Sequence, residues 1–133
     1  MNENELAGLL ESLKRMGSDD FSVEVKESAT TLSRDVWETV SAFANTAGGI
    51  IVLGVSERAG FVPVANFETE KVLNQFVAGM GDAGGRGKLA NPPKYTIERV
   101  ELRGTVVLVI TIEELDPSSK PCYVIERGAQ GGS

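Results

Sequence analysis

The chain has 133 residues, 41% of them hydrophobic and 24% charged, with a formal net charge of −6 at pH 7, which indicates one globular domain and disfavours a protein that binds nucleic acid with its whole surface. Because it contains no histidine and a single cysteine, Cys122, the composition excludes histidine-based catalytic pairs and metal sites as well as an internal disulfide. No apolar run approaches the roughly 20 residues of a membrane span, and the polar opening residues lack the organisation of a signal peptide, so we expect a cytoplasmic protein.

The N-terminal part of the sequence predicts a helix and then a strand. Leucines recur on one face of residues 3–16, which indicates an amphipathic helix. Residues 21–26 alternate between apolar and polar side chains, with Glu24 and Lys26 on the polar side. This alternation is typical of a half-buried strand whose polar face meets water or a functional site.

The central stretch predicts a helix, a tight turn and a buried strand. The helix has Ser33 as its expected N-cap and carries apolar residues on one face from Val36 onward, and it ends where Gly48 and Gly49 permit a C-cap. The run 50–55 is apolar without alternation. We therefore expect a strand covered on both faces, and a sheet with helices packed on it.

A short edge strand, a third helix and an irregular loop follow. Residues 61–64 include a proline, which suits an edge strand. Asn66 is the expected cap of a helix that runs to about Met80. Residues 81–93 are rich in glycine and proline, so we expect a mobile loop without regular structure.

The C-terminal part predicts a hairpin of residues 95–102 and 105–112, joined at Arg103-Gly104. Apolar residues change phase within the first of these strands, which suggests a bulge. A last short strand is expected at 122–126, before a glycine-rich tail at 128–133. We therefore predict an α/β (α+β) fold with a mixed sheet of about five or six strands and about three helices, in a single domain over residues 1–127 of a longer protein.

Six short motifs resemble the Schlafen-type AlbA-like domain family in their order and spacing. They are Val23-Glu24-Val25-Lys26, Ala42 to Thr46, Gly48-Gly49, Gly54-Val55, Pro92-Pro93 and Lys120-Pro121-Cys122-Tyr123-Val124. The resemblance runs from about Asp19 to Val124. The family is described as a DNA-binding or divergent ATP-binding module of bacterial transcriptional regulators. The resemblance therefore implies a nucleic-acid-related role within a larger chain that has further domains.

Three carboxylates could form a catalytic or metal site. Asp19 and Glu24 lie near the first strand and Glu57 follows the central strand, so they could converge if these strands are neighbours. Asp19 and Glu24 could then bind Mg²⁺ or Mn²⁺ for phosphodiester cleavage. The resemblance implies two Glu and one Asp in ribonuclease members; Glu24 matches, Asp19 stands in place of a Glu, and Glu57 lies where an Asp is expected. The alternative is solvated surface charge.

Lys26 and the turn after the central helix are candidate binding residues. The resemblance implies that Lys26 faces phosphate, whereas an ion pair with a nearby carboxylate is the alternative. In the turn, Asn45 could bind a ligand that approaches the backbone of Gly48 and Gly49. The alternative for the turn is a helix C-cap with close helix–strand packing.

The glycine-rich segment Gly84–Lys88 does not form a P-loop. A P-loop requires a glycine where Asp82 stands and a Ser or Thr where Leu89 stands. The residues therefore give no support for ATP binding, and we expect no cofactor unless the domain is a Mg²⁺- or Mn²⁺-dependent nuclease.

The same segment carries three cations that could contact nucleic acid. Arg86, Lys88 and Lys94 lie on glycine-rich backbone beside Tyr95. Basic loops next to a sheet can follow a phosphate backbone with salt-dependent affinity. The alternative is a solvated loop.

These observations favour a nucleic-acid-binding module for DNA or RNA, which makes mainly phosphate contacts and belongs to a larger regulatory protein. Two other classes stay open. One is a divalent-metal-dependent endoribonuclease, and the other is a homodimerisation or interaction domain without affinity for nucleic acid, which the net charge of −6 favours.

Overall fold

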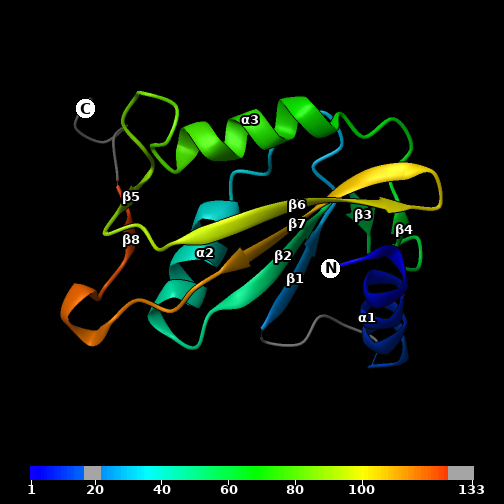
Figure 1. The fold of residues 1–133 in the computed structure, drawn as a ribbon, viewed down its shortest axis with the longest axis horizontal. Helices are drawn as coiled ribbons and strands as arrows, with labels where there is room; N and C mark the ends of the chain where they lie inside the picture. Colours follow the sequence, from blue (N-terminus) through cyan, green and yellow to red (C-terminus); the bar gives the residue numbers. More distant parts are fainter. Residues whose placement is uncertain (17–21, 126–133) are drawn as a thin grey trace.

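The computed structural model describes residues 1–16 and 22–125, which form three α-helices, a 3₁₀ turn (Pro117–Ser119) and eight strands (Figure 1). The helices are α1 (Glu3–Met16), α2 (Val36–Asn45) and α3 (Thr69–Gly79). The main sheet has the order β1 (Val23–Lys26), β2 (Gly49–Leu53), β7 (Thr105–Ile112) and β6 (Tyr95–Leu102). Two short ribbons pair β3 (Val55–Ser56) with β4 (Val62–Pro63) and β5 (Leu89–Ala90) with β8 (Tyr123–Val124). The predicted mixed α/β fold is confirmed, with its strands divided between one sheet and two ribbons.

The sheet is mixed because α2 connects two parallel strands. β1 runs parallel to β2, with Val23 opposite Ile50 and Lys26 opposite Leu53. β7 runs antiparallel to both β2 and β6. A parallel pair needs a crossover connection, and α2 provides it. The first strand and the central strand are therefore neighbours, as the carboxylate hypothesis requires.

Both faces of the sheet are covered, as the apolar run of β2 predicts. Ile51 and Leu53 belong to a core shared with α2 and α3, whereas Val52 between them belongs to a second core under α1. Figure 1 shows α1 separated from α2 and α3 by the sheet. Since side chains alternate between the faces of a strand, a strand buried on both sides is apolar throughout.

The bulge predicted in β6 is wrong. The β6–β7 register is continuous from Tyr95 opposite Ile112 to Leu102 opposite Thr105. The apolar residues change phase because the covered face changes along the strand: Tyr95 packs against the core of α2 and α3, and Leu102 against the core of α1. The two-residue turn at Arg103 (φ 51°) and Gly104 (φ 84°) is as predicted.

Both predicted N-caps are wrong. Asp35 precedes α2, while the hydroxyl of Ser33 lies 3.0 Å from that of Ser28. Glu68 precedes α3, and Asn66 has a left-handed φ of 61° in the loop before it. The Ser33 side chain closes the preceding loop and Asn66 turns it through its backbone conformation, which are competing uses of the same residue types.

Two further boundaries differ from the sequence interpretation. The apolar run 50–55 is interrupted at Gly54, whose φ of 99° and contact with the ring of Phe67 end β2 before β3 begins. The loop predicted at 81–93 contains β5, which pairs with β8. The predicted tail at 128–133 lies outside the described residues.

Close packing joins α2 to α3. The Trp37 ring stacks on Phe76 with centroids 5.3 Å apart, and Phe76 meets the ring of Tyr95 edge-on at 5.4 Å. A Cβ atom at Gly79 would lie 2.0 Å from the Trp37 ring. The end of α3 therefore depends on a residue without a side chain, since well-packed cores resist added atoms.

We expect Gly79→Ala to lower the free energy of unfolding by about 1–3 kcal/mol, because Trp37 must move to admit the methyl group. Gly8→Ala is the matched control. It lies within α1 with nothing within 4 Å of the added Cβ, so it should raise the free energy of unfolding by about 0.5–1 kcal/mol. Urea denaturation followed by tryptophan fluorescence measures both, and equal effects would contradict the packing role of Gly79.

Candidate nucleic-acid interface

The glycine-rich segment after α3 folds back onto the end of that helix. The Lys88 amide donates to the carbonyl of Gly79 at 2.6 Å, and the Asp82 amide donates to the carbonyl of Val77 at 3.0 Å. A Cβ at Gly87 would lie 2.8 Å from the Gly79 carbonyl oxygen, so only glycine fits this approach. The loop is therefore closed at its base and presents Arg86 to solvent.

The β5–β8 ribbon holds the other side of this loop in place. Ile125 donates its amide to the carbonyl of Lys88 at 2.8 Å. Asn45, at the end of α2, donates to the carbonyl of Cys122 at 2.9 Å and accepts from its amide at 2.8 Å. One side chain thus satisfies both backbone groups of a β8-flanking residue and ties the ribbon to α2.

Three of the predicted binding cations are exposed in this region. Arg86, Lys88 and Lys94 are solvent-exposed and form no ion pair with any residue in the described ranges. By contrast, Arg99 binds Glu70 through two nitrogens at 2.6 and 2.8 Å. The three exposed cations are therefore available to an external anion.

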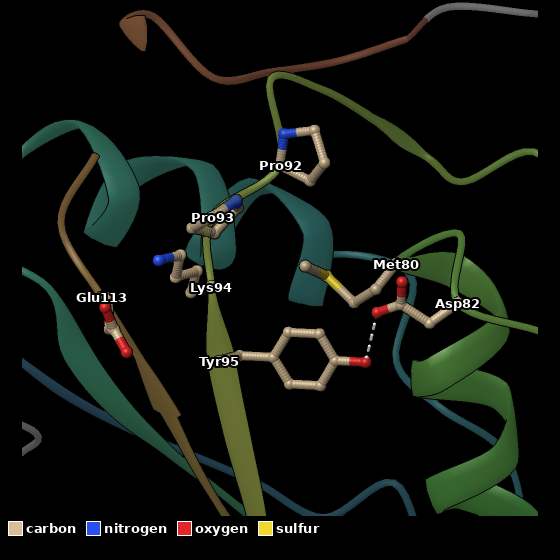
Figure 2. A pocket seen from close by; sticks show the side chains of 7 residues that line it. All are labelled: Met80, Asp82, Pro92, Pro93, Lys94, Tyr95 and Glu113. Atoms are coloured by element: carbon tan, nitrogen blue, oxygen red, sulfur yellow. Dashed lines mark hydrogen bonds between the residues drawn. The ribbon is translucent and has the colours of Figure 1, made fainter. Parts of the chain in front are cut away.

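A pocket opens beside Lys94, with a volume of about 620 Å³ (Figure 2). It is lined by Met80, Asp82, Pro92, Pro93, Lys94, Tyr95 and Glu113. The Tyr95 hydroxyl donates to Oδ2 of Asp82 at 2.7 Å. In Figure 2, Tyr95, Met80 and Asp82 lie on one side of β6, whereas Lys94 and Glu113 lie on the other.

Burial, the hydrogen bond to Asp82 and the negative charge of Asp82 together raise the pKa of Tyr95 from 10 to about 12, and burial is the largest of these causes. The phenol is therefore protonated at neutral pH and holds the Asp82 carboxylate in place as a donor. The Tyr95–Asp82 bond connects β6 to the glycine-rich loop.

Lys26 is mostly buried and lies away from these cations. Its side chain is 9% exposed, and its ammonium group lies 3.2 Å from Asp35 and 3.8 Å from Glu24. The structure thus gives Lys26 an ion pair with Glu24, as the alternative interpretation allowed, and adds Asp35, which the sequence interpretation did not include. A phosphate contact by Lys26 stays a prediction.

Gly48 and Gly49 are positions of close packing. Gly48 has φ 78°, donates its amide to the Phe43 carbonyl at 2.8 Å, and leaves no room for a Cβ beside the carbonyl of Ile112. A Cβ at Gly49 would lie 2.6 Å from the Phe43 ring. The turn is a helix C-cap against the sheet, and ligand binding by Asn45, Gly48 or Gly49 stays a prediction.

Two of the three carboxylates in the nuclease hypothesis lie within the described residues. Glu24 lies near Lys26 on β1, and Glu57 is exposed in the turn after β3. Asp19 lies outside the described residues. Within residues 1–16 and 22–125, no group of three or more Cys, Asp or Glu side chains is placed to hold a metal ion. The Asp19–Glu24–Glu57 hypothesis stays a prediction.

Sequence reasoning missed the Tyr95–Asp82 pair, because Asp82 lies 13 residues before Tyr95 and meets it only through the fold of the glycine-rich loop. Glu113 reaches the same pocket from the end of β7, where its amide donates to the Lys94 carbonyl at 3.0 Å. The only available signal was the position of Tyr95 next to three cations.

A family model described as "Schlafen, AlbA_2" matches residues 19–128. The chain belongs to the Schlafen AlbA_2 family. This result confirms the resemblance drawn from the six motifs. The family match begins after α1, so this helix is additional to the matched region.

Two solved structures are similar to this AlbA_2 domain. One is the solution NMR structure of the N-terminal domain of a Nitrosomonas europaea protein described as related to the ATP-dependent DNA helicase RecG; it is 26% identical, covers 95% of this chain and 84% of its own, and has a TM-score of 0.69. The other is the DIP2311 protein of Corynebacterium diphtheriae, at 17% identity, 95% and 31% coverage and a TM-score of 0.40. No curated protein matches the sequence.

None of the helices in the part of the chain that the structure covers has the length and apolar character of a membrane span.

We expect Asn45→Ala to lower the free energy of unfolding by about 1–3 kcal/mol, because both backbone groups of Cys122 lose their partner. Asn74→Ala, at an exposed position on α3, is the control and should change the free energy of unfolding by less than about 0.5 kcal/mol. Chemical denaturation measures both. An unchanged Asn45→Ala variant would show that the ribbon does not depend on this clamp.

The pKa of Tyr95 can be measured by following tyrosinate absorbance as pH rises. Because the pKa is raised, the stabilisation from the protonated phenol is fully present below pH 10 and is lost as pH rises towards about 12. We expect Asp82→Ala to lower this pKa without returning it to 10, since burial is the larger cause. Asp116→Ala, at an exposed aspartate elsewhere, should leave it unchanged. A midpoint near pH 10 for Tyr95 would contradict the effect of its burial.

Proposed function

We propose that this domain binds nucleic acid through phosphate contacts made by Arg86, Lys88 and Lys94, as a module of a larger regulatory protein. The observation that carries the proposal is that these three cations are exposed and free of ion pairs with the described residues. Cations that form no ion pair need not break one before they bind an external anion.

The comparisons support the same function at a coarser level. The family is the one that the motifs predicted, and the relative with a TM-score of 0.69 is a domain of a protein described as related to a DNA helicase. Both observations favour a nucleic-acid-related module. The individual phosphate contacts, and binding to DNA or to RNA, are part of our proposal.

The site favours contacts with the backbone of a strand over sequence reading by hydrogen bonds. Lysine and arginine side chains on a glycine-rich loop act as charges that follow phosphates, and phosphate contacts position a protein without specifying sequence. Three contacts with a single strand predict a slope of about −2 when the logarithm of affinity is plotted against the logarithm of salt concentration. We therefore expect modest, strongly salt-dependent affinity.

The other predicted residues have a supporting role in this proposal. Lys26 would have to leave Asp35 before it could contact a phosphate. Asn45 uses its amide on Cys122, and Gly48 and Gly49 pack against the sheet. We propose that Asn45, Gly48 and Gly49 position the ribbon and the loop that present the exposed cations.

We expect the Arg86→Gln and Lys88→Gln double variant to bind labelled single-stranded RNA and DNA more weakly, with the salt slope reduced by about 0.7 for each cation removed. Lys14→Gln, at an exposed lysine of α1 on the opposite face of the sheet, should bind like the unmodified protein. Fluorescence anisotropy over a range of salt concentrations measures the affinity and the slope.

Absence of binding at low salt would overturn the proposal. A slope that is the same in the double variant and in the unmodified protein would place the contacts elsewhere. The same oligonucleotides, incubated with Mg²⁺ or Mn²⁺, test the ribonuclease hypothesis through Glu24→Gln, and sedimentation of the same samples tests the predicted homodimer.

A further inference from the structure

We infer that the pocket beside Tyr95 is a subsite for one nucleobase that carries an amino group, and that guanine is the base it prefers. The inference deepens the proposed function and rests on it. It starts from the pocket formed where the end of α3, the start of β6 and the end of β7 meet (Figure 2).

The shape of the pocket suits a flat ligand attached to a chain. Its volume of about 620 Å³ lies within the range of roughly 300–1,000 Å³ that small-molecule sites occupy. The side chains of Met80 and Pro93 and the ring of Tyr95 provide apolar wall. A base inside a duplex cannot enter such a pocket, whereas an unstacked base of a single strand can pack on an aromatic side chain.

The polar groups select the kind of base. Asp82 and Glu113 carry carboxylates, which accept hydrogen bonds and donate none at neutral pH. Guanine offers an N–H and an adjacent amino group as donors on one edge, and cytosine and adenine each offer an amino group. Uracil and thymine place a carbonyl oxygen on each side of their single N–H, and a carboxylate repels these oxygens because both groups are negatively polarised acceptors.

Asp82 is the carboxylate that makes the contact. Its Oδ2 accepts from the Tyr95 hydroxyl at 2.7 Å, while no hydrogen bond from a described residue reaches Oδ1. The Tyr95 hydroxyl is the donor in this bond. The carboxylate is therefore held in one orientation beside the apolar wall, which lowers the cost of ordering it when a base binds.

The surrounding charges place the phosphate outside the pocket. Asp82 repels a phosphate from its side of the pocket, whereas Lys94, on the other side of β6, and the exposed Arg86 and Lys88 of the preceding segment attract one. A nucleotide with its base towards Asp82 and its phosphate towards Lys94 satisfies both groups. Glu113 lies beside Lys94 on the same side of β6, so it weakens the attraction of that lysine for phosphate (Figure 2).

The experiment compares strands that differ only in the base. Fluorescence anisotropy is measured for an all-uridine RNA strand and for the same strand with guanosine at alternate positions, and amide NMR shifts are followed during titration with guanosine monophosphate and uridine monophosphate. We expect the guanosine strand to bind about tenfold more tightly. Guanosine monophosphate should shift the amides of Met80, Asp82 and Tyr95 more than uridine monophosphate does.

Two variants with the same change in charge identify the group responsible. Asp82→Asn replaces an acceptor-only carboxylate by an amide that also donates, so we expect the preference for guanosine to disappear. Glu113→Gln should keep the preference and strengthen binding to both strands. Glu101→Gln, on the far end of β6, controls for the added charge and should change neither.

The outcomes separate this inference from the proposed function. Salt-dependent binding with equal affinity for the two strands, unchanged in Asp82→Asn, would overturn the base subsite and leave the phosphate contacts standing. If neither strand binds, the proposed function fails, and the mononucleotide titration then decides the pocket by itself. Equal small shifts with both mononucleotides would overturn it.

Discussion

The contact between the Phe43 ring and the backbone of Gly49 is the constraint on which the rest of the structure depends. The ring occupies the space that a Cβ at Gly49 would need, so α2 lies directly on the sheet. The chain passes from the end of α2 to the start of β2 within a few residues. This placement brings Asn45 within reach of Cys122, whose backbone it binds twice. The β5–β8 ribbon is thereby held to α2, and the ribbon in turn fixes Lys88 through Ile125. A packing contact in the core therefore sets the position of a surface cation.

The sequence was informative where one physical cause dominates a pattern. The unbroken apolar run of β2 has a single explanation, burial on both faces, and the structure has two cores there. The phase change in β6 has two explanations, an extra residue or a change in the covered face. Periodicity within one strand cannot distinguish them, because the difference lies in where α1 and α3 end over the sheet. The same ambiguity affects Ser33 and Asn66, since residues that cap helices also close loops.

In the candidate site, too, some features could be predicted from the sequence and others could not. The exposure of Arg86 and Lys88 could be foreseen, because a segment so rich in glycine has few side chains with which to bury anything. The partner of Lys26 could not, since Asp35 approaches it only once α2 packs on the sheet. The pocket could not be predicted from the sequence either. Asp82 meets Tyr95 because the loop folds back onto Gly79, and this return depends on Gly87 having no side chain.

A net charge of −6 sets a condition on how such a domain binds a polyanion. Charges beyond about 8 Å are largely screened at physiological salt, so the carboxylates that matter are the ones near the exposed cations. Asp82 and Glu113 are carboxylates of this kind, since they line the pocket together with Lys94. In the proposed complex both carboxylates repel a phosphate that enters the pocket, and Asp82 accepts hydrogen bonds from a base that does. Acidic groups at this interface therefore lower the overall affinity while favouring one orientation of the strand, with a base directed inwards and its phosphates directed towards solvent.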